Sequence, residues 1–146
     1  MLNFSNNYFT LALVETDLIL AAINIRDPKH RESENVFNKY LGKLTLSPYS
    51  LVEIDLLLKS GSIVTRDVYS FWDGIGKMLM HYRIFTLQPK PKYHSLAYDV
   101  RLKHSLSYFD SLHAAIALCE KVPIISYDAM YKRVRNLTYL HPSDIV

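Results

Sequence analysis

Cysteine is nearly absent, since the chain of 146 residues has one, Cys119. A single cysteine excludes an internal disulfide, and no zinc-finger spacing exists. Cys119 stands among apolar residues of an expected helix, so we interpret it as a small buried side chain rather than a nucleophile. Disulfides persist mainly in oxidising compartments, so the lack of a cysteine pair favours a cytoplasmic protein.

Long hydrophobic runs and a strong charge of one sign are also missing. The segment 1–25 is apolar in places, but Glu15 and Asp17 interrupt it and no basic residue begins it. We therefore expect neither a signal peptide nor a membrane span. The formal net charge is only +3, which permits an anionic partner without requiring one.

The composition that remains is that of an ordinary globular protein, with 49% hydrophobic and 21% charged residues. We expect one domain over residues 1–146. Short β-rich runs alternate with segments of helical periodicity, and this pattern predicts an α/β layer fold with a mainly parallel sheet. The expected strands are 8–14, 44–46, 83–87, 123–127 and a weak one at 137–140, and the expected helices are 18–25, 29–41, 48–61, 62–82, 93–104 and 108–121.

Four acidic residues stand where such a fold could bring them together. Asp17 and Asp128 each follow an apolar strand, and open α/β sheets bind ligands beyond the carboxyl ends of their strands. Glu53 lies in the helix after the second strand, between two apolar residues. Asp110 lies in the first turn of an alanine-rich helix. These four carboxylates are the candidate site residues.

Helix capping is the competing explanation for each acid. Aspartate directly after a strand, as at Asp17 and Asp128, is a common N-cap. The spacing of Ser107 and Asp110 resembles a capping box. Ser50 and Glu53 have the same spacing, but Pro48 favours Ser47 as the cap and places Glu53 in mid-helix.

Convergence of the four acids would have a definite chemical meaning. Carboxylates about 5 Å apart repel by roughly 3 kcal/mol per pair at an effective dielectric near 20. A fold tolerates such a cluster only with protonation or a bound cation. Oxygen ligands select hard cations such as Mg²⁺ or Mn²⁺, which activate water and neutralise charge on a phosphodiester.

At these residues the sequence resembles the PIN-domain family, including the toxins of toxin–antitoxin pairs. The most specific likeness is the segment YFDSLHAAIA around Asp110, which is similar to the family's D-x-L-H-A-A-x-A helix. The other three segments are weaker alone, but all four occur in the family's order. They are LVETDLIL at 13–20, SPYSLVE at 47–53, YFDSLHAAIA at 108–117 and IISYD at 124–128.

The resemblance implies a three-layer α/β/α fold with a sheet of four or five strands. It also implies a metal-dependent endoribonuclease in which Asp17, Glu53 and Asp110 are the central metal ligands and Asp128 completes the pocket. One or two Mg²⁺ or Mn²⁺ ions would orient a water for attack and leave a 5′-phosphate and a 3′-hydroxyl. Ser126 is a candidate to support Asp128 through its hydroxyl.

The same resemblance implies partners. RNA would be the substrate, and a toxin of this type would pair with a small antitoxin that places a basic side chain, naturally arginine, among the carboxylates. Family toxins pair two subunits, so we expect a homodimer. No membrane partner is expected.

Two features keep alternatives open. Many family members have threonine or serine after the first aspartate, whereas Leu18 follows Asp17, and this favours a non-catalytic PIN-like module that binds RNA or a protein. A phosphatase or receiver domain would place two acids two residues apart after the first strand, or a nucleophilic aspartate after the third. Glu15 precedes Asp17 by two residues, but we expect it to point the opposite way if strand alternation continues.

His113 shares a helical face with Asp110, and packing or hydrogen bonding is its expected role.

Overall fold

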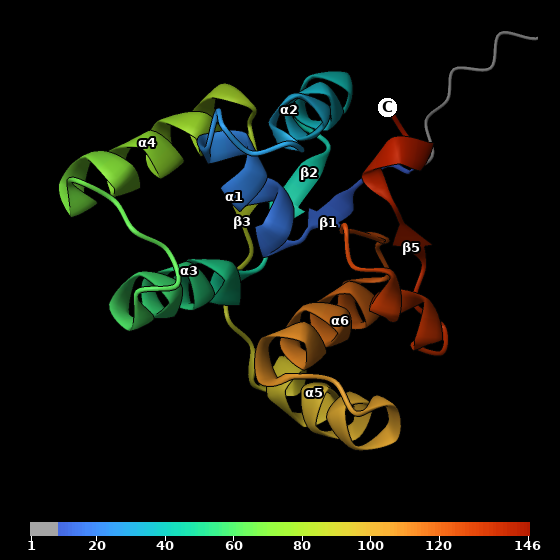
Figure 1. Ribbon diagram of the computed structural model, residues 1–146. Coiled ribbons are helices and arrows are strands. Elements are labelled where there is room, and N and C mark those ends of the chain that lie inside the picture. Colours follow the sequence, from blue (N-terminus) through green and yellow to red (C-terminus); the bar gives the residue numbers. More distant parts are fainter. Residues whose placement is uncertain (1–8) are drawn as a thin grey trace, which may run out of the picture.

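The computed structural model describes residues 9–146, so Tyr8 of the expected first strand lies outside the described residues. Its centre is a parallel sheet with the strand order β3-β2-β1-β4-β5 (Figure 1). This confirms the predicted α/β fold with a central parallel sheet. The strands are β1 (Ala12–Val14), β2 (Leu44–Leu46), β3 (Phe85–Thr86), β4 (Ile124–Ile125) and β5 (Tyr139–Leu140).

Helices cover both faces of the sheet and complete the predicted three layers (Figure 1). One face carries α1, α2 and α4, and the other carries α5 and α6, which pack on each other. Helix α3 contacts both α1 and α6. The helices are α1 (Thr16–Ile23), α2 (His30–Lys39), α3 (Pro48–Ser60), α4 (Val68–His81), α5 (Pro91–His104) and α6 (Tyr108–Glu120), with short 3-10 helices η1 (Ala129–Arg133) and η2 (Pro142–Asp144).

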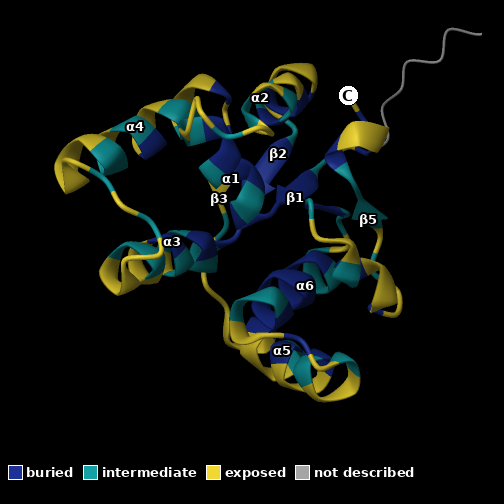
Figure 2. Ribbon diagram, viewed as in Figure 1, coloured by how far each residue is buried: buried dark blue, intermediate teal, exposed yellow. Residues whose placement is uncertain are grey.

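Side-chain alternation along β1 divides the core between the two layers. Ala12 and Val14 belong to the hydrophobic cluster under α1, α2 and α4, whereas Leu13 between them belongs to the cluster under α6. All three are fully buried. Because successive side chains of a strand point to opposite faces, a strand covered on both sides is apolar at every position. Figure 2 shows the central strands β1 and β2 buried and the outer helix faces exposed, whereas the edge strand β3 is exposed and β5 is intermediate.

Local signals in the sequence set the bounds of α3. Ser47 accepts a hydrogen bond from the backbone N–H of Tyr49, Pro48 is the first helical residue, and the left-handed Gly61 (φ 79°) ends the helix. The predicted cap, start and end are therefore confirmed, and Glu53 lies in mid-helix.

Helix α4 begins later than the sequence pattern predicted. We expected it from residue 62, but it begins at Val68, where the side chain of Asp67 caps it by accepting from Tyr69 N–H. Val64, within the expected helix, is 88% exposed and does not pack on the core. The predicted start was wrong because a good cap at Asp67 outweighed apolar periodicity in the six preceding residues. None of the helices over residues 9–146 combines the length and apolar content needed to cross a membrane.

The connections place a crevice between β1 and β4. The chain leaves β1 toward β2 on one side, while the segment after β3 crosses over to β4 on the other. Ligands of open α/β sheets bind where the strand order reverses in this way, beyond the carboxyl ends of the strands. Glu15 directly follows β1 and Ser126 directly follows β4, so these two residues line the crevice.

Candidate active site

Glu15 and Asp17 point into the same crevice. The Ser126 hydroxyl lies 2.8 Å from Asp17 Oδ2 and 3.3 Å from Glu15 Oε2. The expectation that Glu15 points away from Asp17 was wrong, because β1 ends at Val14 and strand alternation ends with it. Glu15 is the N-cap of α1 (φ −77°, ψ 158°), and its carboxylate accepts from Thr16 N–H at 2.9 Å.

His113 of α6 joins Glu15 to Glu53. Its Nε2 lies 3.1 Å from Glu53 Oε1 and 3.7 Å from Glu15 Oε1. The ligand atoms of these three side chains lie within 4.8 Å of one another. His113 is fully buried, and a proton on Nε2 would be donated to the nearer carboxylate. The predicted hydrogen-bonding role of His113 is thus the one that the structure has.

Two hydroxyl groups fix α3 against α1. Thr16 donates from Oγ1 to Ser50 Oγ at 2.9 Å, and the same Thr16 oxygen lies 3.4 Å from His113 Nε2. Thr16 and Ser50 are both buried. Since Glu53 follows Ser50 by three residues on the same helix, this contact sets where the Glu53 carboxylate can lie.

Asp17 lies in the first turn of α1 but does not cap it. Its Oδ2 accepts hydrogen bonds from the Ser126 hydroxyl and from Tyr127 N–H, both at 2.8 Å. Its Oδ1 is buried and has no hydrogen-bond partner within the part of the chain that the structure describes. A buried carboxylate oxygen with no donor is costly, and it is suited to a cation.

Asp110 is held at the N-terminus of α6. Ser107 donates its hydroxyl to Asp110 Oδ2 at 2.5 Å, and the buried Tyr131 of η1 directs its hydroxyl to Oδ1 at 3.4 Å. The Ser107 oxygen also accepts from Asp110 N–H, so Ser107 is the predicted cap. The negative charge of Asp110 is one of those that raise the pKa of Glu15.

Asp128 has a different environment from the other acids. It is exposed, and its Oδ1 accepts from Met130 N–H at 2.9 Å, which makes Asp128 the N-cap of η1. Its backbone N–H donates to Ser126 Oγ at 3.0 Å. The capping alternative therefore describes what Asp128 does, and Ser126 links it to Asp17. The Ser126 side chain contacts the carboxylates of Asp17 and Glu15 and the backbone of Asp128.

Burial dominates the electrostatics of the crevice. It raises the pKa of Glu15 well above the ordinary value, and the negative charges of Asp17, Glu53 and Asp110 act in the same direction. Burial also raises the pKa of Asp17, although the hydrogen bonds from Ser126 and Tyr127 oppose this. The crevice thus favours a proton or a cation on its carboxylates.

Glu53 responds in the opposite direction. Burial acts to raise its pKa, but the hydrogen bond from His113 and the attraction to that ring outweigh burial, so the pKa of Glu53 is lowered. The pKa of the Tyr131 hydroxyl is also raised, first by burial and then by the negative charges of Glu15 and Asp110. Glu53 is therefore ready to act as an anionic ligand.

The side chains present fit a hard divalent cation. Glu15 and Glu53 offer two carboxylates whose ligand atoms, with the ring nitrogen of His113, lie within 4.8 Å of one another, and the charges of Asp17 and Asp110 act on Glu15. Carboxylate oxygens are the ligands that Mg²⁺ and Mn²⁺ prefer.

Sequence analysis missed four residues of this crevice: Glu15, Thr16, Ser50 and Tyr131. One signal for the first two was present, since Glu15 followed by Thr16 is an acid followed by a hydroxyl residue. Many members of the family that the chain resembles have such a pair after the first strand, and Asp17 followed by Leu18 lacks it. Nothing in the local sequence around Ser50 or Tyr131 predicts their contacts.

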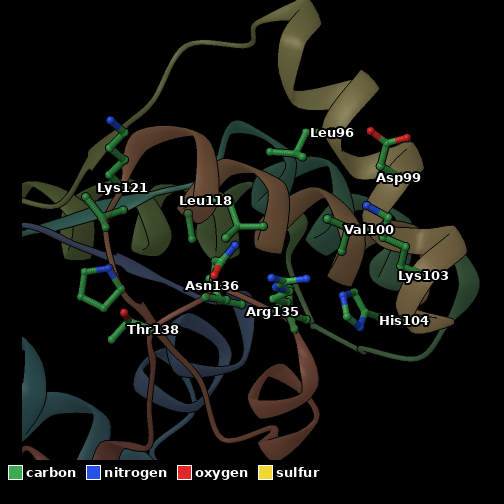
Figure 3. Close-up of a pocket in the computed structure, with 15 residues that line it drawn as sticks. Leu96, Asp99, Val100, Lys103, His104, Leu118, Lys121, Arg135, Asn136 and Thr138 are labelled. Atoms are coloured by element: carbon green, nitrogen blue, oxygen red, sulfur yellow. The ribbon is translucent and has the colours of Figure 1, made fainter.

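A separate cavity of about 730 Å³ lies between α5, α6 and the segment that leads into β5 (Figure 3). Lys103, Lys121 and Arg135 contribute to its lining, as does Asp99. It opens at the amino ends of β4 and β5, and none of the crevice acids lines it. The cavity is therefore distinct from the acidic crevice.

The PIN-domain family model matches residues 12–137, and the chain belongs to the PIN-domain family. No curated protein matches the chain. Among solved structures, the fold is similar to three toxin–antitoxin proteins at low identity. VapBC2 from Rickettsia felis, bound to a DNA fragment from its promoter, has a TM-score of 0.73 and 16% identity over 90% of this chain and 98% of that chain. A toxin–antitoxin complex from Klebsiella pneumoniae has a TM-score of 0.65 and 14% identity, over 90% of this chain and 97% of that chain. The sarcin–ricin loop cleaving toxin VapC20 from Mycobacterium tuberculosis has a TM-score of 0.66 and 15% identity, over 83% of this chain and 92% of that chain.

Proposed function

We propose that this PIN-domain protein is a metal-dependent endoribonuclease that hydrolyses RNA phosphodiester bonds. The observation that carries the proposal is the meeting of Glu15, Glu53 and His113 with the charges of Asp17 and Asp110 at the carboxyl edge of the sheet. Those side chains come from α1 with its N-cap, α3 and α6, so the cluster depends on the tertiary fold. A buried cluster of acids with no cation opposes folding, and such a cluster is expected where a function requires it.

Glu15, Glu53 and Asp110 would hold one or two Mg²⁺ or Mn²⁺ ions, with Asp17 and Asp128 completing the acidic pocket. We place Glu15 in the role that the resemblance assigned to Asp17, because Glu15 is the first acid after β1 and Thr16 follows it. When bound, a divalent ion neutralises charge on the phosphodiester and lowers the pKa of a bound water.

The remaining side chains position the ligands. His113 donates to Glu53 and keeps it anionic. Ser126 and Tyr127 N–H orient Asp17. The Thr16–Ser50 hydrogen bond fixes the spacing between α1 and α3. Each contact reduces the freedom of a carboxylate before metal and substrate arrive, which is what second-layer hydrogen bonds do in metal enzymes.

Purified protein and a labelled single-stranded RNA test the proposal. We expect cleavage in Mg²⁺ or Mn²⁺, no cleavage in EDTA, and fragments with 5′-phosphate and 3′-hydroxyl ends. Glu53→Gln should abolish cleavage, whereas the matched control Asp55→Asn, an exposed acid on the same helix, should not. Cleavage in EDTA, or full cleavage by Glu53→Gln, would contradict the proposal.

The proposed biological role, that of a toxin in a toxin–antitoxin pair, comes from the structurally similar proteins. The Klebsiella structure is a toxin–antitoxin complex and VapC20 is a toxin, which supports a toxin whose antitoxin inserts a basic side chain among the acids. Expression of the protein should arrest growth, and Glu15→Gln should relieve the arrest. A homodimer, to be tested by light scattering, and a cytoplasmic location are part of the same proposal, as is a single domain over 1–146.

The second candidate is a non-catalytic PIN-like module that binds RNA or a protein. The capping role of Asp128 favours it, because a carboxylate that caps η1 is partly occupied. Binding of RNA with no cleavage in any divalent metal would select this candidate.

A further inference from the structure

An apolar pocket adjoins the acidic crevice. It has a volume of about 440 Å³ and lies between the later turns of α3 and the start of α6, lined by Glu53, Leu56, Leu57, Lys59, Ser60 and Phe109. Glu53 belongs to both the crevice and the pocket, and Phe109 directly precedes Asp110. The pocket therefore begins at one proposed metal ligand, Glu53, and is lined by the residue next to another, Asp110.

The ring of Phe109 is held in place. It stacks on His113 with ring centroids 6.5 Å apart and an interplanar angle of 26°, and Tyr108 meets it edge-on at 5.3 Å. Phe109 is half-buried. A fixed aromatic ring that keeps part of its surface accessible is suited to stacking on a flat ligand.

The rest of the lining points to the same class of ligand. Leu56 is 47% exposed, so an apolar side chain stands open to solvent beside an acidic site. Lys59 forms no ion pair within residues 9–146 and lines the same pocket. An apolar and aromatic pocket with one cation matches a nucleobase whose own phosphate lies beside the lysine.

We propose that this pocket between α3 and α6 binds a nucleobase of the substrate next to the phosphodiester held at the acids. The proposal rests on the proposed nuclease function and adds a substrate requirement to it. A base can enter the pocket only if it is unpaired and turned out of a stack, so the pocket selects single-stranded RNA. The base would also position the strand relative to Glu53 and Asp110.

Binding without cleavage tests the pocket. Fluorescence anisotropy in EDTA compares a 12-nucleotide oligo(U) with an abasic RNA backbone of the same length and charge. We expect the wild-type protein to bind oligo(U) about 10-fold more tightly than the abasic strand, because base stacking on an aromatic side chain contributes on this scale. Phe109→Ala should bind the two strands equally, and Phe109→Trp should keep the preference.

Matched controls separate the pocket from general surface effects. Tyr98→Ala removes an aromatic ring that is 59% exposed and lies outside the pocket, and it should change nothing. Leu56→Glu should weaken oligo(U) binding, whereas Leu41→Glu, at a residue 45% exposed beyond the pocket, should not. Leu56 is partly exposed, so this second variant tests the pocket even if Phe109→Ala fails to fold.

Each result has one meaning. Equal binding of both strands by the wild-type protein, or an unchanged preference in folded Phe109→Ala and in Leu56→Glu, overturns the base pocket. A change in oligomeric state on Phe109→Ala with no change in RNA preference also overturns it, because a second copy of the chain would then occupy the pocket. If the base preference holds but no metal supports cleavage, the base pocket stands and the nuclease proposal fails.

Discussion

The Nε2 atom of His113 lies 3.1 Å from Oε1 of Glu53, which stands 60 residues earlier in the chain. The contact joins α6 to α3 and gives the partly buried Glu53 carboxylate its main favourable interaction. Burial acts on Glu53 in the opposite direction and favours the neutral acid. The imidazole thus keeps the Glu53 carboxylate ionised although burial opposes its charge.

We predict that His113→Ala shifts the pH profile of cleavage. The pKa of Glu53 should rise when the donor is lost, so activity should fall more at pH 5 than at pH 8. The variant should also lose about 2–4 kcal/mol of stability, because a fully buried side chain leaves a cavity. Cleavage rates across pH, with a thermal melt on the same sample, provide the check. A profile that keeps its shape while the overall rate falls would make His113 a packing residue only.

Glu15→Gln and Asp17→Asn distinguish the two assignments of the first acid. We expect Glu15→Gln to lower kcat/KM by at least about 100-fold, the scale on which a primary charge-stabilising group acts. Asp17→Asn should lower it about 10-fold, because Asp17 is held by Ser126 and Tyr127 and acts beside the proposed ligands. Steady-state kinetics at saturating Mg²⁺ give the ranking. The reverse order would restore Asp17 as the central ligand.

Stability in metal-free buffer should depend on Glu15. Its folded-state pKa is raised above the ordinary value of 4.5, so its contribution to stability is fully present below pH 4.5 and is lost as pH rises through the raised pKa. In EDTA, the Tm of the wild-type protein should therefore fall between pH 5 and pH 8. Glu15→Gln should flatten this trend and raise the Tm at pH 8 by about 3 °C, equivalent to about 1 kcal/mol. A Tm for the variant below that of the wild type across this range would mean that the cap at α1 outweighs the buried charge.

A divalent metal should stabilise the wild-type protein and not the ligand variants. At a concentration about 100 times the Kd, one bound ion contributes about 2.7 kcal/mol. Mn²⁺ and Mg²⁺ should raise the Tm of the wild type, and Glu53→Gln should remove most of the increase. Asp55→Asn, with its exposed carboxylate on the same helix, serves as the control. An equal increase in the wild type and Glu53→Gln would place the binding of metal elsewhere.

Local signals in the sequence predicted most of the helices and strands. Buried parallel strands are rich in apolar residues, so Ile124–Ile125 and Leu44–Leu46, where Thr45 is the one polar residue, were recognisable without any contact. The caps Ser47 and Ser107 were equally readable, because a cap acts within one helical turn. The start of α4 was not, since apolar periodicity continued through residues that the folded core does not cover.

The sequence by itself determined the family, the parallel sheet and the segments that bring acids to one edge, because periodicity and caps act over a few neighbouring residues. Only the tertiary structure decided which acid after β1 faces Glu53 and His113. That choice depends on one residue: β1 ends at Val14 and Glu15 caps the next helix, so the alternation that would have turned Glu15 away has already ended. Contacts such as Thr16 with Ser50 and Tyr131 with Asp110 join distant segments, and only packing of the helices across the sheet could bring them together.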